Sequence, residues 1–164
     1  MTKRISYMSI LLALGLVLNL MVQVFSIQGM KVDFVVVMLC LSLLLAESYE
    51  ETLLAGLAFG LLTALTTTFP NGQIANIIDK FMIALILYTI KNIFHLSLTH
   101  KTHVFMFGLI ATLLSGSIFL AVALTLSQSL NMFSFLFVTI VIPSTIGNCI
   151  MLPIASKILM SVKK

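Results

Sequence analysis

The sequence predicts an all-α integral membrane protein, a bundle of six transmembrane helices with both termini in the cytoplasm. First, 60% of its 164 residues are hydrophobic, and only nine are basic and five acidic. A water-soluble domain of this size needs more polar residues to cover its surface. Second, these few charges are clustered, and the uncharged runs between them are long enough to cross about 30 Å of hydrocarbon. The charges therefore mark the ends of helices.

The uncharged runs set the limits of the predicted helices. Runs 5–30 and 52–78 each suit one span, whereas the 55-residue run 102–156 is long enough for two. A polar patch at 127–131 marks the turn within that long run. Two shorter runs reach spanning length only with their polar flanks. Within a single domain covering 1–164, we expect helices near residues 5–27, 30–46, 50–67, 75–94, 103–127 and 131–160.

The distribution of basic residues predicts the orientation, because Lys and Arg concentrate in cytoplasmic segments. With both termini inside, only Lys31 and Lys80 fall on the outer side. The other seven fall on the inner side: Lys3, Arg4, Lys91, Lys101, Lys157, Lys163 and Lys164. On the inner side, Ser48 followed three residues later by Glu51 predicts a capping box at the start of the third helix.

The richest polar stretch follows the third predicted helix, and polar groups at the ends of apolar spans mark candidate functional sites. Pro70 predicts a turn, and Gln73, Asn76 and Lys80 share one face of the next helix, with Asp79 beside them. A solvated outer loop is the alternative, with Lys80 reaching out of the membrane. The candidate binding residues are Thr66, Thr67, Thr68, Phe69, Asn71, Gln73, Asn76, Asp79 and Lys80.

A second polar set precedes the second helix. Lys31 and Asp33 interrupt an apolar passage, and Asn19 and Gln23 lie four residues apart on one face of the first helix. A zwitterionic amino acid requires a partner for its carboxylate and another for its ammonium. Lys31 or Lys80 can serve the carboxylate, and Asp33 or Asp79 the ammonium. The alternative is that these acids and bases form ion pairs at the membrane surface.

The sixth predicted helix carries two prolines and an asparagine. Pro143 predicts a kink whose freed backbone groups nearby hydroxyls can satisfy. Asn148 lies one turn after Ser144 on the same face. Hydrogen bonding between helices is the more frequent use of such residues, and ligand contact is the alternative.

The sequence gives little support for a catalytic function. The chain has no HExxH, GxSxG or P-loop motif. His95, His100 and His103 cluster in one predicted loop that holds no carboxylate, so we expect no metal site there. We expect neither an enzyme nor a bound cofactor.

Residues 64–80, which read ALTTTFPNGQIANIIDK, resemble the signature of the bacterial tryptophan transporter family TrpP, and the Gly29-Met30-Lys31-Val32-Asp33 turn and the length agree. The resemblance implies a multi-pass protein of the bacterial cell membrane that takes up L-tryptophan, with the lipid bilayer around it. The amino acid would bind from the outer face at Lys31, Asp33 and the 66–80 region. Its indole ring would lie against Phe69, and Gln73, Asn76 or a threonine would accept the indole N–H.

TrpP in turn resembles the S components of energy-coupling factor (ECF) transporters, six-helix proteins that bind a small solute near the outer face. In those proteins, small residues four apart on the first helix contact a transmembrane coupling protein that two ATPases drive. Ser9 and Ala13 occupy that pattern here. Two alternatives stay open: an S-component-like carrier for another small solute or vitamin, and a membrane subunit that transports nothing.

Overall fold

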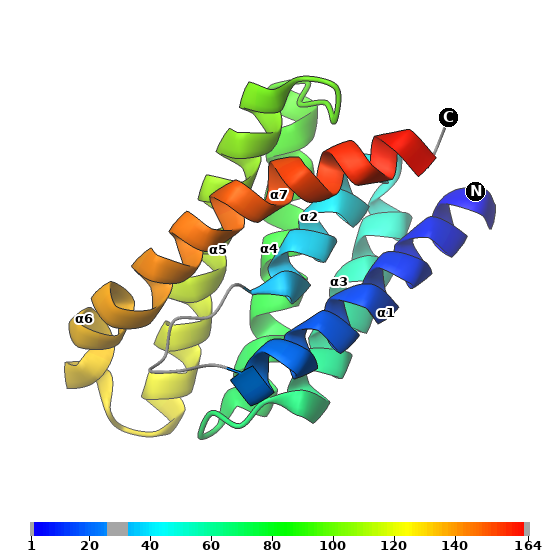
Figure 1. The fold of residues 1–164 in the computed structure, drawn as a ribbon. Coiled ribbons are helices and arrows are strands. Elements are labelled where there is room, and N and C mark those ends of the chain that lie inside the picture. The colour runs from blue at the N-terminus through cyan, green and yellow to red at the C-terminus, as the bar shows by residue number, and fades with distance from the viewer. Residues whose placement is uncertain (1, 26–32, 163–164) are drawn as a thin grey trace.

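The computed structural model describes residues 2–25 and 33–162. All regular secondary structure in this part of the chain is helical (Figure 1). The long helices are α1 (Thr2–Phe25), α2 (Phe34–Leu45), α3 (Tyr49–Thr66), α4 (Gly72–Ile93) and α5 (Lys101–Leu126). The last predicted span comprises a 3-10 turn η1 (Leu130–Met132), a short α6 (Phe133–Leu136), a π-helical turn η2 (Phe137–Val141) and the long α7 (Ile142–Val162). The predicted all-α class is confirmed.

Three helices begin three or four residues from their predicted starts: α1 at Thr2 rather than at residue 5, α2 and α4. Local geometry explains the last two. The second helix begins at Phe34 rather than at residue 30, because the Asp33 carboxylate accepts from the backbone N–H groups of Val35 and Val36, at 3.1 Å each, as an N-cap does. The fourth begins at Gly72 rather than at residue 75. There the predicted turn closes with Asn71 at φ 55°, and the helix follows immediately.

In the predicted helix at 131–160, a π-helical turn lies just before Pro143, where the sequence predicts a kink. Proline has no N–H to donate to the preceding turn, so the regular hydrogen-bond ladder cannot continue there. The Thr145 hydroxyl donates to the Val141 carbonyl at 2.7 Å, as expected for a hydroxyl beside a proline. This irregular segment forms part of the wall of the site described below.

Helix α2 lies at the centre of the bundle. All its residues except Phe34 are buried, and it contacts α1, α3, α4, α5 and α7. With 12 residues it is about 18 Å long, shorter than a span. Within residues 2–25 and 33–162, four segments are long and apolar enough to cross a membrane: Lys3–Val22, Gly72–Ile93, Lys101–Leu126 and Leu130–Val162. Exposed apolar side chains on α1 and α7, such as Val17 and Ile158, suit contact with lipid.

Glycines allow α3 and α4 to approach each other closely. A Cβ at Gly56 would lie 2.8 Å from Ala84 Cβ, and one at Gly60 would lie 3.2 Å from Ile77 Cα. Only glycine fits at such distances, as in other small-xxx-small helix contacts. The contact brings the end of α3, with its threonines, beside the polar start of α4.

The two ends of the bundle differ. Both termini and the α2–α3 and α4–α5 connections lie at one end, and the α3–α4 and α5–η1 turns lie at the other (Figure 1). At the first end, the Ser48 half of the predicted capping box is confirmed, because Ser48 Oγ accepts from the Glu51 N–H at 3.2 Å. The buried Glu51 carboxylate accepts from the Glu47 N–H and pairs with Arg4 of α1 at 3.2 Å. Helices α1 and α3 are thus joined at this end.

Candidate functional site

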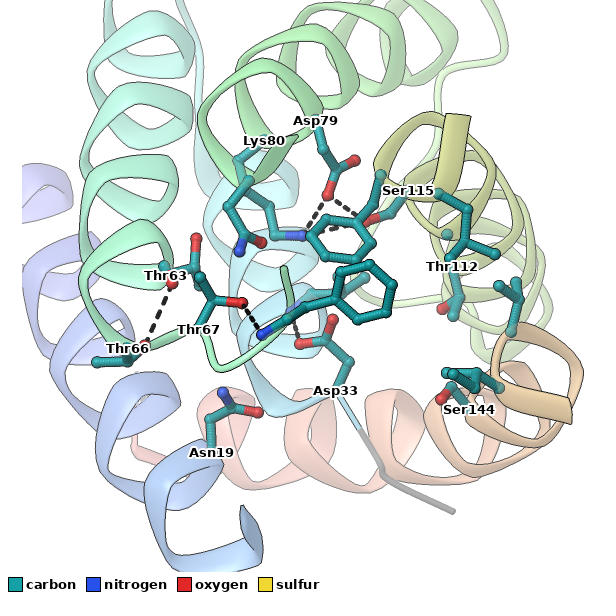
Figure 2. A pocket seen from close by; sticks show the side chains of 18 of the residues that line it. Asn19, Asp33, Thr63, Thr66, Thr67, Asp79, Lys80, Thr112, Ser115 and Ser144 are labelled. Carbon is teal, nitrogen blue, oxygen red and sulfur yellow. Dashed lines mark hydrogen bonds and ion pairs between the residues drawn. The ribbon is translucent and has the colours of Figure 1, made fainter. Parts of the chain in front are cut away.

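A cavity of about 390 Å³, called here the main cavity, lies beside the α3–α4 turn (Figure 2). Its walls come from α1, the start of α2, the end of α3, α4, α5, η2 and the start of α7. Its lining residues are Asn19, Asp33, Val36, Thr63, Thr66, Thr67, Thr68, Phe69, Pro70, Asn76, Asp79, Lys80, Thr112, Ser115, Gly116, Phe119, Leu120, Ile140, Val141 and Ser144.

A buried acid and base lie together in the wall formed by α4 and α5. Lys80 Nζ lies 2.5 Å from Asp79 Oδ2 and donates to Ser115 Oγ at 3.1 Å. Ser115 Oγ in turn donates to the same Asp79 oxygen at 2.8 Å, so Lys80 and Ser115 both reach toward Asp79 (Figure 2). Asp79 is 0% and Lys80 2% exposed. Two opposite charges so deeply buried are tolerable because each offsets the other, and this burial excludes a solvated surface ion pair.

The other oxygen of Asp79 differs from the first. Asp79 Oδ1 is buried and has no hydrogen-bond partner among the residues that the structure describes. A buried carboxylate oxygen without a partner costs free energy, and native proteins rarely retain such atoms without a reason. Although Asp79 lines the main cavity, Oδ1 itself has almost no accessible surface and does not face the open space of the cavity (Figure 2).

An aromatic pair forms part of the apolar lining of the main cavity. The rings of Phe69, from the α3–α4 turn, and Phe119, from α5, meet edge to face with centroids 5.3 Å apart. The Phe69 N–H donates to Thr67 Oγ1 at 3.3 Å, which fixes the turn that carries the ring. Leu120 and Val141 add aliphatic surface. The cavity therefore combines charged groups with an apolar surface that suits a flat ring.

Asn148 of α7 connects two walls of the cavity without lining it. Its Oδ1 accepts from the Asp33 N–H at 3.0 Å, and its Nδ2 donates to Thr112 Oγ1 at 3.1 Å. The side chain is 1% exposed. Asn148 thus makes the hydrogen bonds between helices that the sequence favoured over ligand contact.

Nine of the predicted binding residues line the main cavity together: Asn19, Asp33, Thr66, Thr67, Thr68, Phe69, Asn76, Asp79 and Lys80. Asn71, Gln73 and Asn148 do not. Asn71 donates instead to Ser127 Oγ at 3.0 Å, and Gln73 is exposed in the first turn of α4. Lys31 and the side chain of Gln23 fall outside the part of the chain described here.

Several lining residues were not among the predicted ones, chiefly on α5. Thr112 and Ser115 lie three residues apart within an apolar helix, and Thr63 lies one turn before Thr66 and Thr67. Polar residues on one face of a span were a usable signal for all three. Phe119 carries no such signal, because a phenylalanine in a transmembrane helix is unremarkable.

A second cavity, of about 220 Å³, lies between α1 and α3 at the other end of the bundle. Ser9 lines it and Ala13 does not, although both are exposed on α1. Its other lining residues, except Glu51, are apolar. Among the described residues, no group of three His, Cys, Asp or Glu side chains is placed to hold a metal ion.

Comparisons with known proteins agree on one family. The family model described as "Tryptophan transporter TrpP" matches residues 1–164. The chain is 36% identical over 99% of its length to a "Probable tryptophan transport protein" of Clostridium acetobutylicum, of which it covers 92%. Proteins of the same name from Clostridium perfringens and Bacillus subtilis are 34% and 35% identical over 91% of this chain and 86% of their own lengths.

No solved structure shows a significant match to the chain. The names of the family and of these relatives describe transport proteins rather than enzymes. With several helices long and apolar enough to cross a membrane, the chain is a multi-pass bacterial membrane protein. On the match over its full length, it belongs to the TrpP tryptophan transporter family.

Proposed function

We propose that this protein takes up L-tryptophan and that the main cavity is where the amino acid binds. The observation that carries the proposal is the combination, in one cavity, of the buried Asp79–Lys80 pair with the Phe69–Phe119 aromatic pair. A zwitterion with an aromatic side chain needs both. At about 390 Å³ the cavity falls within the range of about 300–1,000 Å³ usual for small-molecule sites.

The indole ring, in this proposal, lies against Phe69 and Phe119. A buried indole N–H requires an acceptor, and Thr63 and Asn76 supply candidate oxygens in the same cavity. Asn76 is 8% exposed, so a hydrogen bond to it would be shielded from water. Gln73, the third acceptor expected from the sequence, is exposed outside the cavity and has no part in this arrangement.

We further propose that six segments span the membrane, α2 only together with its polar flanks, that both termini are cytoplasmic and that the cavity opens outward. The basic residues support this orientation: Lys3 and Arg4 lie in the first turn of α1, Lys91 in the last turn of α4 and Lys101 at the start of α5. These helix ends lie opposite the α3–α4 turn (Figure 1), and residues of that turn line the cavity. The amino acid would then enter from outside. Single cysteines at the exposed Thr99 and Asn131 test this topology with a membrane-impermeant thiol reagent. Intact cells should label only Asn131→Cys, since both native cysteines are buried.

Binding has a direct test, because the chain contains no tryptophan residue. Bound L-tryptophan would be the only indole in a purified sample, and its emission should shift to shorter wavelength in an apolar cavity. At a ligand concentration 100 times Kd, binding should also stabilise the fold by about 2.7 kcal/mol. Absence of both effects would contradict the proposal. Stabilisation by another small solute but not by tryptophan would favour the alternative carrier.

The energy source needs a separate experiment. An S-component-like protein would dock on a coupling protein through Ser9 and Ala13, and the exposure of both on α1 supports this assignment. Uptake of labelled L-tryptophan into vesicles should then require the coupling protein, two ATPases and ATP. Uptake by the chain alone, driven by an ion gradient, would contradict the assignment. A Ser9→Leu, Ala13→Leu double variant should bind tryptophan normally and fail only in uptake.

A further inference from the structure

Asn76 of α4 carries a buried amide that the protein itself leaves unpaired. The residue is 8% exposed and lines the main cavity. Its side chain makes no hydrogen bond with any residue in the described part of the chain. An amide has two N–H donors and an oxygen acceptor, and burying these groups without partners costs free energy. Contacts within the protein therefore do not explain why an asparagine lies here.

The amide of Asn76 is open to the main cavity. Two buried side-chain atoms of the described residues lack both a partner and accessible surface, namely Asp79 Oδ1 and His103 Nδ1. Neither Oδ1 nor Nδ2 of Asn76 is among them, so both atoms keep some accessible surface. Since the residue is buried and lines the cavity, that surface faces the cavity. A ligand can therefore reach this amide, whereas it cannot reach Asp79 Oδ1.

The other unpaired polar groups of the lining lie in more open positions. Asn19 makes no hydrogen bond among the described residues, and the hydroxyls of Thr67 and Thr68 donate none there. Asn19 and Thr67 are partly exposed, and Thr68 is exposed. Among these four side chains, Asn76 is the most shielded from water.

The buried hydroxyls of the lining are already bonded. Thr63 donates to the carbonyls of Phe59 and Gly60 at 2.7 and 3.0 Å, and Thr112 donates to the Gly108 carbonyl at 2.9 Å. Such a hydroxyl can still offer a ligand its oxygen lone pairs. Its proton is satisfied in the empty cavity, however, and the amide of Asn76 has no partner until a ligand binds.

We propose that Asn76 Oδ1 accepts the indole N–H of the bound ligand, and that this hydrogen bond selects an indole over rings that lack an N–H. The inference rests on the proposed function, and it chooses between Thr63 and Asn76 as the acceptor. The ammonium and the carboxylate of an amino acid take charged partners, which Asp33 and Lys80 offer in the same cavity. The indole N–H is neutral, so a neutral buried acceptor suits it and leaves no charge unpaired.

Two ligands of the same shape isolate this hydrogen bond. They are L-tryptophan and 3-(benzothiophen-3-yl)-L-alanine, in which a sulfur atom replaces the indole N–H and the ammonium and carboxylate are unchanged. Their Kd values are measured by calorimetry on the full chain in lipid nanodiscs. The unmodified protein should bind L-tryptophan about tenfold more tightly, because the analogue makes no hydrogen bond to the amide. Equal affinities for the two ligands would overturn the inference.

Variants assign the preference to Asn76. Asn76→Ala removes the amide and adds no atom that could obstruct the cavity. Affinity for L-tryptophan should fall about tenfold, whereas affinity for the analogue should change little, so that the preference disappears. Equal losses for both ligands would mean that the amide contacts a group that they share, which would overturn the inference. Asn92→Ala, the same change at an exposed position of α4, is the control.

Thr63→Val tests the alternative acceptor. This variant removes the hydroxyl and keeps the shape of the side chain, and it should keep the preference for L-tryptophan over the analogue. Loss of the preference in Thr63→Val, with its retention in Asn76→Ala, would assign the indole N–H to Thr63 and overturn the choice of Asn76.

Stability gives a second readout and binding separates the two proposals. Thermal unfolding of the ligand-free Asn76→Ala variant should change little, because no hydrogen bond within the protein is lost. A clear loss of stability would assign the amide a structural role and overturn the inference. If L-tryptophan and the analogue bind equally well, only the inference about Asn76 fails. If neither ligand binds, the proposed function fails as well.

Discussion

Asn148 offers a prediction whose magnitude can be worked from the structure. The side chain is 1% exposed and joins the start of α2 to α5 through two hydrogen bonds, to the Asp33 N–H and to Thr112 Oγ1. Asn148→Ala removes both. Thr112 keeps its bond to the Gly108 carbonyl, but the Asp33 N–H loses its partner.

Each lost hydrogen bond contributes about 0.5–1.5 kcal/mol, and an unsatisfied buried N–H costs about 1–3 kcal/mol. We therefore expect Asn148→Ala to lower the free energy of unfolding by about 2 kcal/mol. For a chain of this size, that corresponds to a Tm lower by about 4–8 °C. Affinity for L-tryptophan should also weaken about fivefold, because a wall that carries Asp33 is held less firmly.

The assay uses the two free cysteines, Cys40 and Cys149, which are buried and react with a fluorogenic thiol dye only when the chain unfolds. Thr112→Val removes the bond between Asn148 and Thr112 together with the bond from Thr112 to the Gly108 carbonyl, and it leaves the bond to Asp33. Since it also breaks two hydrogen bonds, it should lower Tm by a similar amount. Asn92→Ala, at an exposed position of α4, is the matched control and should change nothing.

One result would refute this reasoning. Unchanged stability in Asn148→Ala would mean that the two hydrogen bonds carry no net free energy, so that Asn148 does not position the start of α2.

Two further predictions concern the α3–α4 contact and the aromatic wall. Gly56→Val should lower the free energy of unfolding by about 1–3 kcal/mol or prevent folding, because the valine side chain would meet Ala84 Cβ. The thiol-dye assay measures this change, and Leu57→Val, at an exposed position, is the control. A normal Tm for Gly56→Val would contradict the close contact. Phe119→Ala should weaken L-tryptophan binding about tenfold, since it removes an aromatic surface. Calorimetry measures this loss of affinity. An effect no larger than that of Phe105→Ala, at an exposed position, would exclude Phe119 from the site.

Much of the fold was predictable because hydrocarbon thickness constrains helix length. Charges mark helix ends, so five of the predicted helices agree with long helices to within a few residues. The interruption before Pro143 was only partly predictable. A proline indicates that the hydrogen-bond ladder breaks, but not whether a kink or a π-helical turn replaces it.

The candidate site was predictable where polar residues follow one another in sequence. The 66–80 stretch delivers most of its predicted residues to one cavity. Gln73 does not reach the cavity, although it shares a helix face with Asn76 and Lys80. Helical periodicity predicts the face on which a side chain lies, but not how far the neighbouring helices extend to cover that face. For Ser115, the polar face that it shares with Thr112 indicates a buried contact, but only packing shows that its partner is Asp79.

The glycine contact between α3 and α4 has a consequence for motion. The two helices meet at backbone distance, and together with their turn they carry Thr63, Phe69, Asp79 and Lys80. Such a contact leaves no soft side-chain layer along which one helix can slide past the other. The hairpin therefore moves as one body. Any opening that admits a ligand has to separate another wall of the cavity from it, namely α1, the start of α2, α5, the π-helical segment or the start of α7, and these are the elements in which transport should be followed.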